Sequence, residues 1–141
     1  MLRVATTGVL AGAILFLAGC SEGIPRATVE GTVTLDGAPV EHGVISFTPI
    51  GETRGPSTQV TIKDGKYSLE QREGPIVGTN RVEILAYRKT GKKVPDMTQK
   101  GVFIDEIAQA APPSYNSKST LERTLNPGQN TLNFDLDGKA K

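Results

Sequence analysis

Short segments of alternating polarity, separated by turn-forming pairs, recur along most of this chain of 141 residues. Within residues 31–49, the segments Thr32–Leu35 and Val44–Phe47 flank an Asp36-Gly37 pair. Such a pair favours a two-residue hairpin turn, because glycine accepts the positive φ that the turn needs. Gly31, inside the first segment, predicts a bulge or the close approach of another backbone.

The same turn chemistry returns later in the chain. A second Asp-Gly pair occupies positions 64–65 and an Asn-Pro-Gly turn occupies 126–128, between further alternating segments at 58–62, 67–69, 80–88 and 130–136. Short segments at this spacing, without a long helix, are typical of all-β domains. The sequence therefore predicts an all-β fold, an antiparallel β-sandwich of about seven strands.

Residues 89–111 break this pattern. They contain few strand signals, and Ile104–Ala110 is the one helix-like piece. A loop of this length is unusual inside a compact domain and is often functional or mobile. We expect a long loop here, in which Phe103, Ile104 and Ile107 cover an open end of the sandwich. The alternative is that these apolar side chains form a partner-binding surface.

Residues 1–20 have the layout of a bacterial export signal. Arg3 supplies the positive start, and Val9–Ala18 is an apolar run too short to span a bilayer of about 30 Å as a mature helix. The end of the run, Leu17–Cys20, resembles the lipobox of bacterial lipoproteins. The resemblance implies cleavage between Gly19 and Cys20, a diacylglyceryl group on the Cys20 thiol and an acyl chain on the new amine.

Cys20 is the sole cysteine, which excludes an internal disulfide and a cysteine-based zinc site. Each buried CH₂ of an acyl chain contributes ~0.8 kcal/mol, so several chains together anchor a protein durably. Ser21, where some lipoproteins have Asp, implies sorting to the outer membrane in a cell with two membranes. We expect this covalent lipid, with no other cofactor. The expected divisions are a signal peptide (1–19), a lipidated tether (20–27), the sandwich domain (28–136) and a polar tail (137–141).

Three stretches together resemble the carboxypeptidase regulatory-like domains. They are GTVTLDGAPVEHGVISFTP (31–49), TIKDGKYSL (61–69) and NRVEILAY (80–87). Residues 112–136, with Pro112 and Tyr115-Asn116, also resemble the final segment of small bacterial lipoproteins of this type. The resemblance implies a transthyretin-like (Ig-like) sandwich and a non-catalytic module. Two departures are Gly43, where that family often has Ala, and the absence of the usual His or Tyr near residue 80.

Charge gives little direction about partners. Of 16 Lys and Arg, Arg3 lies in the leader, which leaves 15 basic against 15 acidic residues. This balance, together with export, argues against nucleic acid as a partner. One basic cluster supplies candidate contacts for anionic headgroups, lipopolysaccharide or an acidic partner: Arg88, Lys89, Lys92 and Lys93. The alternative is a solvated hairpin tip or loop, since no aromatic residues are interleaved with these cations.

Catalytic and metal motifs are weak. His42 is the only histidine, and no nucleophile elbow of the form G-x-S-x-G accompanies it. Four aspartates near turns do not form the alternating run of a calcium loop: Asp36, Asp64, Asp135 and Asp137. We therefore expect no enzyme activity, no catalytic residue and no metal site.

The sequence favours a membrane-anchored lipoprotein of the cell envelope, facing the periplasm or exported to the surface, with a non-catalytic β-sandwich used for binding or structure. Its expected partners are the membrane, through the lipid, and an envelope protein or polysaccharide. Three alternatives remain open. They are a small-ligand or carbohydrate-binding module using residues 89–111, a transthyretin-like hydrolase, and an assembly factor that pairs an edge strand with another protein.

Overall fold

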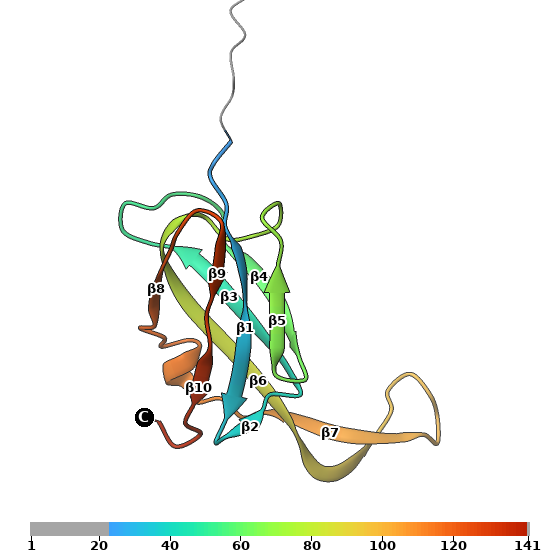
Figure 1. Cartoon of the computed structure of the whole chain (residues 1–141). Coiled ribbons are helices and arrows are strands. Elements are labelled where there is room, and N and C mark those ends of the chain that lie inside the picture. Colours follow the sequence, from blue (N-terminus) through green and yellow to red (C-terminus); the bar gives the residue numbers. More distant parts are fainter. Residues whose placement is uncertain (1–22, 141) are drawn as a thin grey trace, which may run out of the picture.

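The computed structural model describes residues 23–140 (Figure 1). The leader, with Gly19, Cys20 and the cleavage site expected there, lies outside the described residues. Ten strands and one 3₁₀ turn follow in order: β1 (Thr28–Leu35), β2 (Ala38–Pro39), β3 (His42–Pro49), β4 (Thr58–Lys63), β5 (Lys66–Leu69), β6 (Gly78–Pro95), β7 (Phe103–Gln109), η1 (Pro113–Tyr115), β8 (Glu122–Leu125), β9 (Gln129–Thr131) and β10 (Phe134–Leu136). The prediction of an all-β fold is confirmed.

The strands form the two layers of a sandwich. In one layer β3 lies between β4 and β6, antiparallel to both, and β8 pairs with the start of β6. In the other layer β1 lies between antiparallel β5 and the short parallel strands β9 and β10. β4 and β5 pair only at Lys63 and Lys66, so their hairpin passes from one layer to the other. The turn between β8 and β9 also connects the two layers, on the opposite side of the sandwich.

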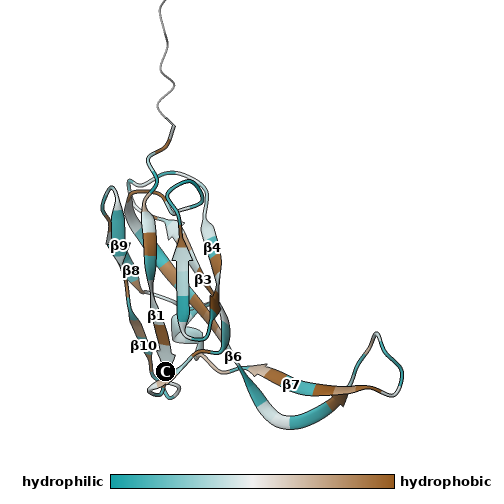
Figure 2. Cartoon of the chain, turned by 45° about the vertical axis from the view of Figure 1, so that its right-hand side comes forward, coloured by the Kyte–Doolittle hydropathy of each residue, from teal (hydrophilic) through white to brown (hydrophobic). Residues whose placement is uncertain are grey.

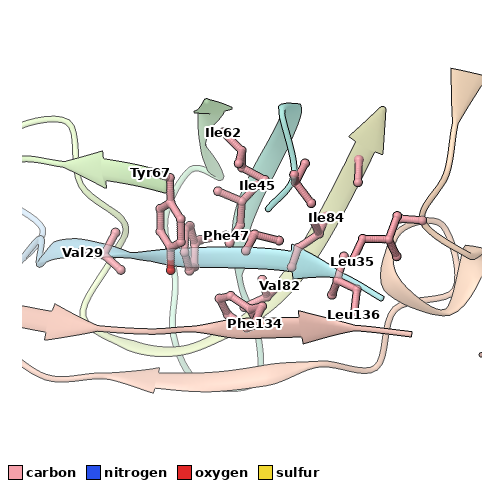
Figure 3. Close-up of a cluster of buried hydrophobic side chains, with 14 of the residues drawn as sticks. Val29, Leu35, Ile45, Phe47, Ile62, Tyr67, Val82, Ile84, Phe134 and Leu136 are labelled. Carbon is pink, nitrogen blue, oxygen red and sulfur yellow. The ribbon is translucent and has the colours of Figure 1, made fainter. Parts of the chain in front are cut away.

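In the strands of the sandwich, the apolar side chains of one face point between the layers. Figure 3 shows Ile45 and Phe47 of β3 beside Ile84 and Val82 of β6, in one cluster with side chains of the other layer. The Phe47 and Tyr67 rings lie with their centroids 6.3 Å apart. The core consists of Ala27, Val29, Val33, Leu35, Val40, Ile45, Phe47, Ile62, Tyr67, Val82, Ile84, Ala86, Ala111, Leu125, Phe134 and Leu136. Residues 27–136 therefore enclose a core of their own.

The two Asp-Gly turns have the backbone that the sequence requires. Asp36 and Gly37 have φ values of 52° and 82°, and Asp64 and Gly65 have 50° and 74°. Two consecutive positive φ angles define the hairpin turn whose twist matches that of the flanking strands. These turns set the register of β1 with β2 and of β4 with β5.

Gly31 allows another segment to lie directly against β1, as its position within the strand predicts. A Cβ atom at this residue would lie 1.7 Å from the carbonyl oxygen of Leu132. The Tyr67 hydroxyl donates a hydrogen bond of 2.7 Å to the same oxygen. The segment between β9 and β10 is thus held against β1 by contacts that a side chain at residue 31 would block.

The expectation for residues 89–111 is wrong. They form no loop and no helix: β6 continues to Pro95, a short tip follows, and β7 returns antiparallel to β6. Ile104 and Ile107 are three residues apart, a spacing that indicates a helix. Instead, the ion pairs of Asp105 with Lys89 and Lys93 and the backbone pairing of β6 with β7 hold this segment as a strand. Phe103, Ile104 and Ile107 are exposed, so they do not cover an end of the sandwich.

The count of about seven strands was also too low. Residues 130–136, expected as one strand, divide into β9 and β10. The break falls at Leu132-Asn133, where the Asn133 side-chain oxygen accepts a hydrogen bond of 3.0 Å from the backbone N–H of Thr32. The side chain replaces one rung of the backbone ladder, and the strand is interrupted there.

Candidate docking site on a two-stranded arm

The far half of β6 and the whole of β7 form an arm that stands away from the sandwich (Figures 1 and 2). We define the arm as residues 87–109. His42–Tyr87 is a terminal pair of β3 with β6, and Tyr87 also pairs with Gln109 of β7. From Tyr87 onward β6 therefore leaves β3 and continues with β7 alone.

The arm leaves the body at the end far from the tether. Its root lies beside the turn that follows β1, where Arg88 Nη2 is 3.5 Å from Asp36 Oδ2. Asp36 Oδ1 also accepts a hydrogen bond of 2.8 Å from the backbone N–H of Gly138. The chain enters the described part at residue 23, near the start of β1, which is the opposite end of the body (Figure 1). Arm and tether are therefore separated by the length of β1.

A group of three charges joins the two strands of the arm. Lys93 Nζ lies 2.6 Å from Asp105 Oδ1, and Lys89 Nζ lies 3.2 Å from Asp105 Oδ2. The hydrogen bond from Lys93, and then that from Lys89, lowers the pKa of Asp105 below its ordinary value. This carboxylate thus compensates one of the two lysines that hold it.

A bulge lies between those two lysines. The pairs Lys89–Ile107 and Lys93–Asp105 leave residues 90–92 of β6 opposite Glu106 alone. The Thr90 hydroxyl donates a hydrogen bond of 2.5 Å to Glu106 Oε2. Gly91 has a φ of 84°, a conformation that glycine adopts without strain. A bulge of this kind bends its strand and interrupts the pairing edge.

The tip of the arm is an ordered turn. Asp96 Oδ1 accepts hydrogen bonds from the Thr98 hydroxyl (2.6 Å) and the Thr98 N–H (2.7 Å), and these lower the pKa of Asp96. The Asp96 N–H donates to the Val102 carbonyl at 2.8 Å, which closes the turn. Met97 projects from it with 96% of its surface exposed.

Apolar exposure in the described part of the chain is concentrated on the arm. Five of the six exposed large hydrophobic side chains belong to it: Met97, Val102, Phe103, Ile104 and Ile107. The sixth, Ile24, belongs to the segment expected as the tether, residues 20–27. Phe103 and Ile107 are 62% and 58% exposed and share one face of β7, because they are four residues apart in a strand. Exposed apolar clusters on a soluble domain mark interaction sites.

The candidate contact residues of the sequence all lie on the arm, but most of them already have partners. Lys89 and Lys93 bind Asp105, and Arg88 pairs with Asp36. Lys92 makes no ion pair among the described residues. The structure does not gather four free cations into one anion-binding surface. The exposed Met97 and Val102 were missed, although Val102 begins the apolar run that continues through Ile104.

His42 and the turn aspartates have structural surroundings. His42 is exposed at the start of β3, and Asp64 forms part of a turn. Asp135 Oδ1 accepts a hydrogen bond of 2.6 Å from the Thr34 hydroxyl, and Asp137 Oδ1 accepts one of 2.8 Å from the Lys139 N–H. Within residues 23–140 no three His, Cys, Asp or Glu side chains gather to hold a metal ion.

A hollow lies on the side of the sandwich between β4 and β5. These strands part after their turn, and the space of about 550 Å³ between them is lined by Val60, Thr61, Tyr67 and Ser68, with Glu30 and Thr32 of β1. Its walls include hydroxyl groups, one aromatic ring and three charged residues, Glu30, Lys63 and Lys66.

Comparison with the models of protein families, with curated proteins and with solved structures finds no match to this chain. Among the described residues, no helix has the length and apolar character needed to cross a membrane. The fold and the arm therefore define the class that the structure supports: an all-β, sandwich-like domain that carries an exposed two-stranded arm.

Proposed function

We propose that this chain is a lipid-anchored cell-envelope protein whose β-sandwich is a non-catalytic module and whose arm is its docking element. One observation carries the proposal: the arm stands clear of the body and bears five of the six exposed large hydrophobic side chains of residues 23–140. An exposed strand pair of this kind is suited to binding another protein. The body supplies a rigid support for it.

The anchor in this proposal is Cys20, acylated after cleavage at Gly19, in the outer membrane of a cell with two membranes. Only eight residues, 20–27, separate that cysteine from β1, so the sandwich would lie close to the membrane. The arm leaves the far end of the sandwich, so the length of the sandwich would separate it from that membrane and place it in the envelope space (Figure 1). An envelope protein is therefore a better occupant than the lipid headgroups beside the anchor.

The sequence resemblance to carboxypeptidase regulatory-like domains supports a non-catalytic role, and it remains part of the proposal. Gly43 departs from the alanine common in that family, and the structure gives a local reason. A Cβ atom at residue 43 would lie 2.5 Å from the Leu85 carbonyl oxygen, so β3 and β6 lie too close here for alanine.

A ligand-binding role is the second candidate, favoured by the hollow between β4 and β5 rather than by residues 89–111. The arm stands away from the sandwich and lies over no sheet face, which disfavours a carbohydrate site between the two (Figure 2). The hollow beside Tyr67 offers hydroxyl groups and one aromatic ring. A hydrolase would need a base with partners, and the His42 side chain makes no hydrogen bond or ion pair among the described residues.

The docking role is tested by cross-linking in envelope membranes that carry the full, anchored chain. A double variant, Phe103→Ser with Ile107→Ser, removes two exposed apolar side chains of the arm and touches no core residue. Ile24→Ser is the matched control, because Ile24 is 53% exposed and lies off the arm. We expect the arm variant to lose its protein adducts and the control to retain them. Adducts that survive the arm variant unchanged would contradict the proposal.

The anchor is tested separately by intact-mass analysis of the protein extracted from membranes. The proposal predicts a chain that begins at Cys20 and carries the mass of three acyl chains. A chain with an unmodified Cys20 thiol would contradict the lipid anchor and leave the docking role of the arm to be judged by cross-linking.

A further inference from the structure

The two edges of the arm differ in how they are protected. The outer edge of β6 carries the bulge at residues 90–92, Lys92 and Lys93, and Pro95, which has no N–H to donate. Bulges, charged side chains, especially lysines, and proline are devices that hinder another strand from pairing with an edge. β7, with the sequence FIDEIAQ, has no bulge, lysine or proline and is the outermost strand of its sheet. Its two charged side chains are held by β6, Asp105 by two lysines and Glu106 by the Thr90 hydroxyl. β7 is thus open to strand addition.

The charges of the arm favour a second copy of this chain as the added strand. Residues 87–109 contain five basic and three acidic residues. Arg88 pairs with Asp36, and Lys89 and Lys93 share Asp105. The other charges are two cations, Lys92 and Lys100, and two anions, Asp96 and Glu106, so the arm together with Asp36 carries five positive and four negative charges. A nearly balanced arm of this kind fits a copy of itself better than a strongly acidic or basic partner.

The distribution of apolar surface points the same way. Apart from Ile24, every exposed large hydrophobic side chain of the described residues lies on the arm. A second copy has one cluster of exposed apolar side chains among its described residues, which is its own arm. It can therefore cover this surface with apolar side chains only through that arm. The contact is then isologous and closes on itself as a dimer.

We propose that β7 pairs antiparallel with β7 of a second copy across a twofold axis, which joins two arms into one four-stranded sheet. The proposal rests on the docking role of the arm and names its occupant. A two-stranded ribbon alone is marginally stable, and two added strands give each ribbon a neighbour. Both copies project their arms from the end far from the tether, so two chains anchored in one membrane present them at the same height.

The side chains of β7 favour a register centred on Asp105. In that register Phe103 of each copy lies opposite Ile107 of the other copy. Both pairs lie on the same face of the sheet as Asp105. Each Asp105 keeps its two lysines, and Glu106 lies opposite Ile104. A register centred on Glu106 would place two carboxylates without lysine partners directly opposite each other, which is unfavourable.

Disulfide trapping tests both the pairing and its register. The domain that begins at Ser21 contains no cysteine, and residues 27–136 hold its complete core. Phe103→Cys and Ile107→Cys are made as separate single variants of this domain, mixed and oxidised. Opposed residues of an antiparallel pair have Cα atoms about 4.5–5.5 Å apart, which a disulfide can span. Both side chains are exposed, so neither change disturbs the core.

We expect the mixture to give the 103–107 disulfide at least ten times faster than either variant alone. The matched control is Ile104→Cys mixed with Ile107→Cys, since these positions lie on opposite faces of β7 and should cross-link slowly. Equal rates in both mixtures, or no disulfide in either, would overturn the proposal. If the domain also sediments as a monomer while the serine variant still loses its envelope adducts, the docking role stands and self-pairing fails.

Discussion

Gly31 shows how one residue determines the spacing of two segments. The Leu132 carbonyl lies so close to β1 that a methyl group at residue 31 would overlap it. The sequence predicted either a bulge or a close approach from the glycine alone, and the structure confirms the close approach. Which segment would approach was not predictable, because Leu132 is 101 positions further along the chain.

Replacing Gly31 with alanine should therefore destabilise the sandwich. The methyl group must displace the backbone between β9 and β10 and weaken the hydrogen bond from Tyr67, and overpacking of this kind costs about 1–3 kcal/mol. Gly23→Ala is the control, since a Cβ atom there meets nothing within 4 Å. Denaturant unfolding of both variants provides the measurement. Equal stability would show that the backbone at Leu132 moves freely.

The Tyr67 hydroxyl supports the close approach of Leu132 to β1, because it donates a hydrogen bond to the Leu132 carbonyl oxygen. Tyr67→Phe removes one hydrogen bond and should lower the free energy of unfolding by about 1 kcal/mol. Tyr87→Phe is the control, because the Tyr87 hydroxyl makes no hydrogen bond among the described residues. A loss that is equal in both variants would contradict a special role for Tyr67.

Burial raises the pKa of Tyr67 well above its ordinary value of 10.0, and this predicts a loss of stability in alkali. The phenol stays protonated in the folded chain while it ionises in the unfolded chain, so unfolding releases a proton above pH 10. The contribution of Tyr67 to the free energy of unfolding should therefore be constant below pH 9 and fall as pH rises through 10 toward the higher folded pKa. Comparison with Tyr67→Phe isolates this contribution, and an identical fall in that variant would contradict it.

At the scale of elements, the sequence was informative where turn chemistry and alternation agree. β4 and β5 are joined by Asp64-Gly65, whose positive φ values only certain residues tolerate, and both strands were predicted with their inward faces. β6 was recognised as far as residue 88, where its buried alternation ends. Signals of this kind are local and need no knowledge of distant segments.

The arm was not predictable because its strands have no buried face. Strand prediction relies on alternating burial, and β7 exposes apolar side chains on both of its faces. Its pairing with β6 depends on Asp105 meeting Lys89 and Lys93, twelve or more positions away, and on a bulge that offsets the register. No local pattern in the sequence indicates that offset, so we expected a long loop with one helix-like piece, and that expectation is wrong.

Asp105 should control how firmly the two strands of the arm are held together. Asp105→Asn keeps the shape of the side chain and removes the charge that both lysines share, so amide hydrogen exchange in β7 should become several times faster. Asp96→Asn is a matched control for the loss of a carboxylate, because its hydrogen bonds lie in the tip. Unchanged exchange in Asp105→Asn would show that backbone pairing alone holds the arm.

The same carboxylate predicts the behaviour of the arm in acid. Since the pKa of Asp105 is lowered by Lys93 and Lys89, its contribution is present above the ordinary value of 3.8 and is lost as pH falls through the lower folded value. We expect the carboxyl carbon resonance of Asp105 to titrate below pH 3.8, with faster exchange in β7 over the same range. Titration at the ordinary value would contradict the ion pairs.

At the scale of the whole molecule, the sandwich contains the core and the arm carries most of the exposed large hydrophobic side chains of the described residues. No side chain of residues 89–107 belongs to the core, which lies entirely in the sandwich and at the base of the arm. The fold class was therefore predictable from the sequence, whereas the arm, which contributes nothing to the core, was not. In our proposal, stability and interaction are carried by separate parts of one chain.

This division predicts that the arm can be removed without loss of the fold. Arg88 and Ala108 are a paired position of β6 and β7, so an Asn-Gly turn in place of residues 89–107 closes the ladder there. The free energy of unfolding should change by no more than about 0.5 kcal/mol, as for surface changes away from the core. A loss of several kcal/mol in denaturant unfolding would show that the arm supports the body.

The central claim is that the arm docks this protein to another chain in the envelope. It is tested most directly by cross-linking membranes that contain either the full anchored chain or the chain in which Asn-Gly replaces residues 89–107. Our account predicts that the shortened chain is present at equal amount, folded and anchored, and forms none of the protein adducts of the full chain. The same adducts formed without the arm would contradict it.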